Sequence, residues 1–233
     1  MRNFVRAIVL LLALGLSEPV LAGPLEDARA AYRKQDYTTA LRLFRPLADQ
    51  GDARAQIHLG VMYDNGQGVP QDYVQAVKWY RLAADQGDVE AQDYLGYMYQ
   101  HGLGVPQDYV QAVKWYRLAA DRGYARAQDY LGFMYDNGLG VSRDYAQAVQ
   151  WYRLAADRGY AWAQLHLGLM YDHGQGVPQD YVEAHKWFNL AAAGASDADT
   201  RERAVKNRDR VAGMMTPAQI AEAQKRAREW QPK

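Results

Sequence analysis

The stretch Asp72–Gly87, DYVQAVKWYRLAADQG, returns at a fixed interval along the chain. It recurs at Asp108–Gly123 and at Asp144–Gly159, and once more, altered, at Asp180–Gly194. The interval is 36 residues, and one tryptophan marks it in each copy, as Trp79, Trp115, Trp151 and Trp187. A fixed period of this length is typical of a stacked array, in which each unit buries its apolar face against its neighbours.

Each copy carries the signals of two helices joined by a glycine-containing loop. The first helix is predicted to end at Asn65-Gly66-Gln67-Gly68, because glycine readily adopts the left-handed conformation that stops a helix. Asp72 is the predicted N-cap of the second helix, with Gln75 as its capping-box partner. Later copies fill these two positions with Asp108 and Gln111, Asp144 and Gln147, and Asp180 and Glu183.

Two further positions recur without change and are assigned to packing. A glycine lies inside the first helix of every unit, as Gly60, Gly96, Gly132 and Gly168. Glycine within a helix costs ~1 kcal/mol relative to alanine, so its recurrence predicts a close contact that a Cβ atom would block. The repeated tryptophans do not vary either, and we expect them in the core.

The predicted fold class is all-α, an α/α superhelical solenoid with capping helices at both ends. The helix Asp36–Asp49 keeps the register of the repeats, whereas Asp199–Ala212 and the helix after Thr216 follow the last period. The predicted division is a signal peptide at 1–22, an N-terminal capping hairpin (a partial repeat) at 23–51, repeats at 52–87, 88–123, 124–159 and 160–195, and C-terminal capping helices at 196–233.

The first 22 residues have the pattern of a signal peptide. Arg2 and Arg6 precede an apolar run, Ala7–Leu16, and Val20-Leu21-Ala22 ends in a small residue before Gly23. Ten helical residues rise only ~15 Å, which is too short for a hydrocarbon core of ~30 Å. We expect an exported mature chain without a transmembrane segment, in the periplasm, with secretion as the alternative.

Charge and composition narrow the kinds of partner. The chain has 27 Lys or Arg and 27 Asp or Glu, so its formal net charge is zero and we expect no nucleic-acid partner. Nine basic and four acidic residues lie between Arg201 and Lys233. We interpret this basic end as the solvated face of a cap, and weak contact with an anionic surface is the alternative.

The consensus of the four copies closely resembles the Sel1-like repeat, a relative of the tetratricopeptide repeat. It reads A-x-A-Q-x-x-L-G-x-M-Y-x-x-G-x-G-V-x-x-D-Y-x-x-A-x-x-W-Y-x-x-A-A-x-x-G, covers Gly51–Gly194 and matches Asp36–Gly51 in part. The resemblance implies a solenoid adaptor or scaffold, often in exported bacterial proteins. Some cysteine-rich relatives are associated with β-lactam binding or hydrolysis. This chain has no cysteine, so binding or hydrolysis of β-lactam or peptidoglycan fragments is kept only as an alternative function.

Positions that differ between the copies predict where a partner binds. The first helices of such solenoids line the concave surface, and four of their positions vary in one stripe. We predict that this stripe binds a protein or peptide, because aromatic residues and arginine dominate binding hot spots. Packing between successive first helices is the alternative. This concave strip consists of Arg54, His58, Val61, Asn65, Glu90, Tyr94, Tyr97, His101, Arg126, Tyr130, Phe133, Asn137, Trp162, His166, Leu169 and His173.

The varying charges Arg54, Glu90 and Arg126 are expected to set specificity, and no catalytic pattern accompanies them. The serines are not flanked as in a nucleophile elbow, and neither H-x-x-x-H nor H-E-x-x-H occurs. His166 and His173 are separated by ~10 Å of helical rise, too far to share a metal ion. The chain is therefore predicted to be a non-enzymatic protein without cofactor or metal. Its partner and oligomeric state stay open.

Overall fold

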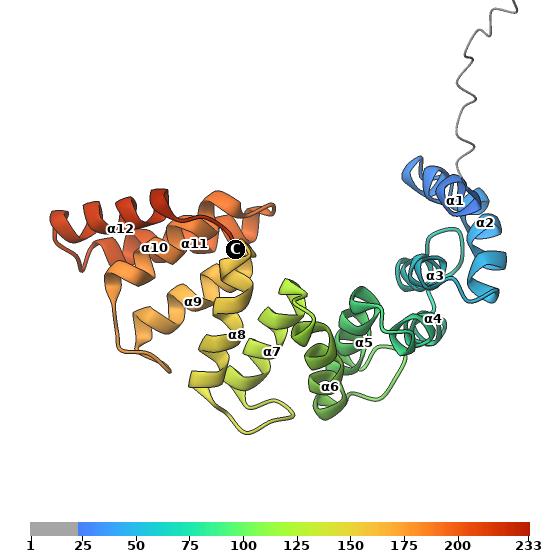
Figure 1. The fold of residues 1–233 in the computed structure, drawn as a ribbon, viewed down its shortest axis with the longest axis horizontal. Coiled ribbons are helices and arrows are strands. Elements are labelled where there is room, and N and C mark those ends of the chain that lie inside the picture. The colour runs from blue at the N-terminus through green and yellow to red at the C-terminus, as the bar shows by residue number, and fades with distance from the viewer. Residues whose placement is uncertain (1–22) are drawn as a thin grey trace, which may run out of the picture.

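The fold is a curved stack of helix pairs. The computed structural model describes residues 23–233, which form twelve helices and no strand. The predicted signal peptide, 1–22, lies outside the described residues. From α1 to α11 consecutive helices pack against each other, α12 packs on α10, and the pairs follow one another along a crescent (Figure 1). The all-α solenoid predicted from the period is confirmed.

Each repeat contributes one odd-numbered and one even-numbered helix. The hairpin at the N-terminal end is α1 (Pro24–Arg33) and α2 (Tyr37–Asp49). The four units are α3 (Ala53–Asn65) and α4 (Tyr73–Asp85), α5 (Val89–His101) and α6 (Tyr109–Asp121), α7 (Ala125–Asn137) and α8 (Tyr145–Asp157), and α9 (Ala161–His173) and α10 (Tyr181–Gly194). The closing helices are α11 (Ala198–Ala212) and α12 (Pro217–Glu229).

The even-numbered repeat helices begin at the predicted aspartates, but the predicted capping boxes are wrong. Asp72 Oδ1 accepts from the backbone N–H of Gln75 at 3.0 Å, and the later copies repeat this bond. The reciprocal bond is missing because the backbone N–H of Asp72 already donates to the carbonyl of Tyr63. Among the described helices, only α12 has a complete capping box, between Thr216 and Gln219.

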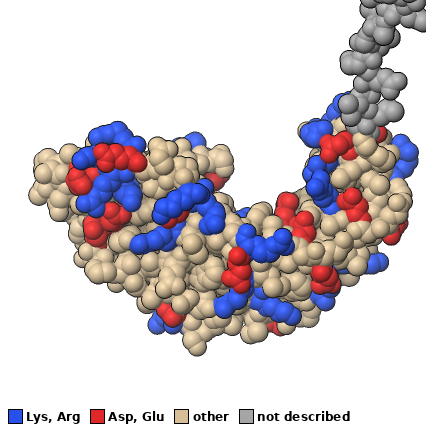
Figure 2. All heavy atoms as spheres, viewed as in Figure 1, with Lys and Arg blue, Asp and Glu red and all other residues tan. Residues whose placement is uncertain are grey.

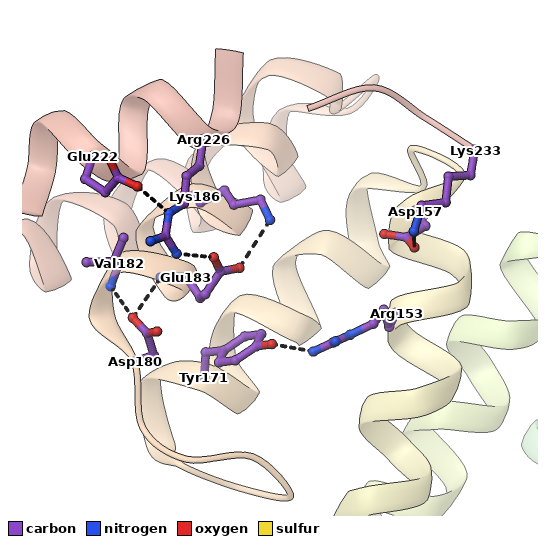
Figure 3. A network of polar contacts seen from close by, with 10 residues as sticks. All are labelled: Arg153, Asp157, Tyr171, Asp180, Val182, Glu183, Lys186, Glu222, Arg226 and Lys233. Atoms are coloured by element: carbon purple, nitrogen blue, oxygen red, sulfur yellow. Dashed lines mark hydrogen bonds and ion pairs between the residues drawn. The ribbon is translucent and has the colours of Figure 1, made fainter. Parts of the chain in front are cut away.

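Glu183, the predicted capping partner in the last unit, has a different role. Its carboxylate accepts from Arg226 of α12 at 2.8 Å and from Lys186 at 3.2 Å (Figure 3). Glu183 therefore joins α10 to the closing helix instead of capping its own helix.

The glycines inside the first helices make the predicted close contacts. A Cβ atom on Gly96 would lie 2.6 Å from the ring of Tyr116, which is fully buried between the two helices of its unit. The other three glycines face Tyr80, Tyr152 and Phe188 in the same way. The missing side chain lets α5 approach an aromatic ring on α6, so the contact is with a side chain rather than with backbone.

Neighbouring units are joined by a repeated arginine–tyrosine contact. The guanidinium of Arg81 on α4 donates to the hydroxyl of Tyr99 on α5, in the next unit. The same contact recurs between Arg45 and Tyr63, Arg117 and Tyr135, and Arg153 and Tyr171. Figure 3 shows the last of these pairs. The repeated tryptophans pack beside the same junctions: Trp79 and Trp187 are buried, whereas Trp115 and Trp151 are half-buried.

The final residues, 230–233, form a C-terminal tail that returns to the third unit. The Trp230 ring packs edge-on against Trp187, with centroids 6.4 Å apart, and lies against Gly159. Lys233 binds Asp157 through its backbone N–H at 2.8 Å and its Nζ at 2.7 Å (Figure 3). At the preceding junction Arg158 lies against Gly123, but the equivalent residue of the last unit is Gly194. Trp230 thus occupies the position that an arginine takes elsewhere.

Candidate functional site: the concave surface

The sixteen side chains of the concave strip project from α3, α5, α7 and α9, and none of them is buried. In Figure 1, α3 and α5 lie on the inner side of the crescent, with α4 and α6 outside them. The space-filling view shows that this inner side is a hollow in which Lys and Arg lie beside Asp and Glu (Figure 2). The hollow contains two cavities.

The first cavity, of about 370 Å³, lies between α1, α3 and α5. Of the concave strip it includes Arg54, His58, Val61, Glu90 and Tyr94. The remaining lining residues are Arg29, Tyr32, Ile57 and Asp88. Its wall therefore combines aromatic rings with charges of both signs.

The second cavity, of about 410 Å³, extends over α5, α7, α9 and α11. The cavity therefore spans the first helices of three successive units and a closing helix. Of the concave strip it includes Tyr97, His101, Tyr130, Phe133, Trp162 and His166. The remaining lining residues are Gln100, Asp129, Tyr160 and Arg203.

His58 in the first cavity is a neutral, packed histidine. Its ring stacks on Phe44, with centroids 4.5 Å apart, and its Nε2 accepts from Arg29 Nε at 3.4 Å. Burial, helped by the charge of Arg29, lowers the pKa of His58 to about 4. The ring therefore carries no charge near neutral pH and acts as an aromatic wall.

His166 in the second cavity is held by a buried carboxylate. Its Nδ1 lies 2.7 Å from Oδ1 of Asp129, which belongs to the preceding first helix. The ring also packs against Tyr152 and Trp162, with centroid distances of 4.9 and 5.9 Å. The contact with Asp129 and the packing of the ring together fix the orientation of the imidazole.

Arg126 is used inside the array. Its guanidinium pairs with the buried carboxylate of Asp93 on the preceding first helix and lies over the ring of Tyr94, 4.7 Å from the centroid. Burial raises the pKa of Asp93 to about 6, although Arg126 acts in the opposite direction. Arg126, whose charge the sequence analysis assigned to partner specificity, thus forms an ion pair with a carboxylate of the neighbouring unit.

Four other strip residues lie outside both cavities. Asn65 and Asn137 each donate to a carbonyl of their own helix, those of Val61 and Phe133. Leu169 packs against the last core cluster, and His173 is an exposed neighbour of Asp172. The cavities therefore bring together eleven of the sixteen predicted residues.

Comparison with known proteins places this architecture in a family. The model of the Sel1 repeat matches residues 29–52, 53–88, 89–124, 125–160 and 163–196. The chain belongs to the Sel1 repeat family. A comparison with curated proteins finds no match.

Solved structures support the assignment. A Sel1 repeat protein from Oxalobacter formigenes is 30% identical, with a TM-score of 0.68 over 83% of this chain and 86% of the other. A protective antigen of uropathogenic Escherichia coli with an SLR fold is also 30% identical, with a TM-score of 0.58 over 89% of this chain. The match spans 52% of that antigen. Sel1 repeat proteins are typically non-catalytic scaffolds, and this fold suggests a scaffold for protein–protein interaction.

The two cavities are lined mainly by aromatic and charged side chains. Neither is lined by Ser, Thr or Cys. Within residues 23–233, no group of three His, Cys, Asp or Glu is placed to hold a metal ion. In that same part of the chain, no helix combines the length and apolar character that a bilayer span requires. The cavities offer aromatic faces, amides and a few charges.

Several residues that line the two cavities of this Sel1 array were not predicted from the sequence. Asp129 had a visible signal, because its repeat position is Ile57 in the first unit and Asp93 in the second, and so varies as the strip does. Tyr160 likewise replaces an aspartate of earlier units. Arg203 lies on α11, beyond the last period, and comparison of the copies could not find it.

Proposed function

We propose that this Sel1 repeat protein is an exported scaffold that binds a protein or peptide segment along its concave surface. The observation that carries the proposal is that eleven of the sixteen strip residues line two cavities in the hollow of the crescent. A rigid array presents such a surface without reordering, so little of the binding free energy is lost to conformational entropy.

Affinity would come from the aromatic walls and specificity from the charges beside them. Tyr97 and Tyr130 lie 6.4 Å apart by ring centroid, and Tyr97 is the more exposed of the two. Arg54 and Glu90 keep exposed side chains at the first cavity, whereas Arg126 is paired within the array. Partner selection is therefore assigned to Arg54 and Glu90.

The double substitution Tyr97→Ala and Tyr130→Ala tests the binding surface. Truncating two aromatic anchors should weaken partner binding at least about tenfold, because such residues carry most of the energy of an interface. The measurement is in-cell crosslinking of wild type and variant, with mass spectrometry of what is captured and titration of the purified partner.

A matched control changes two exposed apolar residues on even-numbered helices, Leu82→Ala on α4 and Leu118→Ala on α6. It should leave binding unchanged. Tyr130 stacks on Tyr116, so circular dichroism must show that the double tyrosine variant keeps its helices. Equal binding by both variants would contradict the proposal.

Export is tested separately. We expect the chain to be found outside the cytoplasm with Gly23 as its first residue, because Val20-Leu21-Ala22 fits a signal-peptidase site. Fractionation of cells followed by mass spectrometry of the mature N-terminus measures this. A full-length chain in the cytoplasm would contradict export without bearing on the concave surface.

A further inference from the structure

The lining of the second cavity includes an arginine, Arg203, that makes only a long ion pair with an exposed carboxylate. Arg203 of α11 lies over the ring of Trp162, 5.1 Å from the centroid, at one side of the cavity. Among residues 23–233 its charged partner is Asp199, at 3.7 Å, and that carboxylate is 71% exposed. A guanidinium stacked on an aromatic ring is held in place while its N–H groups remain available to a ligand.

The acidic group of the same cavity is already engaged. Asp129 is buried and its Oδ1 contacts His166 Nδ1 at 2.7 Å. Gln100 is also buried, and its Oε1 accepts from the hydroxyl of Tyr116 at 2.8 Å, which leaves its amide group as a donor. Asp129 and Gln100 each have one side-chain oxygen engaged, and Arg203 is the strongest donor among the residues that line the cavity.

The remaining wall is aromatic. Tyr97, Tyr130 and Trp162 come from three different first helices, and they share the cavity with Phe133. A volume of about 410 Å³ lies within the range of pockets that enclose a small ligand or a bulky side chain. A carboxylate beside an aromatic side chain matches this combination, with the ring against the wall and the carboxylate at the guanidinium.

We infer that the second cavity binds an acidic peptide segment, in which a carboxylate stands next to an aromatic residue. The inference rests on the proposed function and names the chemistry of its partner. A cationic segment is disfavoured because Arg203 lies at the cavity and Asp129 is occupied by His166. The carboxylate comes either from an Asp or Glu side chain or from the end of a chain.

Selection of displayed random peptides tests the inference. The mature chain is immobilised, and the enriched peptides are sequenced and then measured by fluorescence anisotropy as labelled synthetic peptides. We expect acidic and aromatic residues to be enriched together. Replacing Asp and Glu by Asn and Gln, or the free C-terminus by an amide, shows which carboxylate is bound.

Arg203→Gln should weaken binding of the selected peptide by about tenfold or more. Arg203→Lys should retain part of the affinity, because a positive charge remains although the bidentate guanidinium is lost. The control Lys225→Gln removes one positive charge from an exposed position on α12 and should leave peptide affinity unchanged. Melting curves check that Arg203→Gln does not unfold α11.

The outcomes separate this inference from the function on which it rests. Neutral or basic peptides that bind wild type but not the Tyr97→Ala, Tyr130→Ala variant would overturn the acidic ligand and leave the concave surface standing. Acidic peptides that bind Arg203→Gln as tightly as wild type would also overturn it. Peptides that bind the double tyrosine variant equally well, or no enrichment at all, would count against both.

Discussion

Gly96→Leu is expected to lower the melting temperature by about 6–12 °C, the shift for a loss of ~3 kcal/mol in a chain of this size. A Cβ atom on Gly96 would lie 2.6 Å from the Tyr116 ring, and Tyr116 is fully buried with its hydroxyl bonded to Gln100. The ring cannot move aside without breaking that bond or disturbing the next unit. Differential scanning calorimetry of residues 23–233 measures the shift.

Two further variants isolate the contact. Gly23→Leu makes the same change where nothing lies within 4 Å, and it should leave the melting temperature nearly unchanged. Combining Gly96→Leu with Tyr116→Ala should destabilise less than the sum of the single changes, because the leucine enters space that the ring vacates. Strict additivity, or a normal melt for Gly96→Leu, would remove the glycine–tyrosine contact from the account of the fold.

Arg126→Ala should lower the free energy of unfolding by about 3 kcal/mol near neutral pH, because it leaves a buried carboxylate without its partner. Asp93 is fully buried, and its Oδ1 has no hydrogen-bond partner among the described residues. The matched control is Arg54→Ala. Arg54 occupies the same repeat position but is exposed and makes no ion pair within residues 23–233, so its loss should change stability little.

The deficit of Arg126→Ala should depend on pH. Burial raises the pKa of Asp93 to about 6, above the value of ~4 for an unfolded chain, so ionisation of Asp93 opposes folding. Its contribution to stability is complete below about pH 4 and is lost as the pH rises through about 6. Without Arg126 this pKa rises further, and the nearby charges of Glu90 and Asp129 act in the same direction.

Urea unfolding of both chains between about pH 4.5 and about pH 8 measures this dependence. The two chains should be close in stability at the acidic end and furthest apart at the basic end. Adding Asp93→Asn to Arg126→Ala should recover much of the loss near neutral pH, because no buried charge remains. A deficit that is constant with pH would mean that Arg126 contributes through its packing on Tyr94 alone.

The sequence alone predicted part of what recurs in the units and missed contacts that depend on how segments fold back on one another. Asp72 as an N-cap and Gly96 as a packing glycine follow from local propensity and from the recurrence of a costly residue. Local sequence could not show that Gln75 fails as a capping partner. The backbone N–H of Asp72, which Gln75 would accept from, donates instead to the carbonyl of Tyr63, nine residues before Asp72. That bond depends on how the loop between the two helices folds back.

The candidate site was likewise predicted only in part. Variation between copies located the inner stripe, since a stripe on one helix is a matter of angular spacing. It could not distinguish Arg54, which is exposed, from Arg126, which turns toward Asp93 of the preceding unit. Such pairings depend on the offset between successive helices, and Arg203 reaches the cavity only because α11 packs on α10 and α9.

The C-terminal tail limits how this architecture can lengthen. A block of 36 residues placed after α10 would displace α11, α12 and Trp230 from the surfaces that they now cover. A block inserted before α5 would leave these helices in contact and keep α5, α7, α9 and α11 in consecutive order around the second cavity. Modular growth that preserves this pocket is therefore confined to the part of the array before α5, and a block inserted between α4 and α5 would separate two of the helices that form the first cavity.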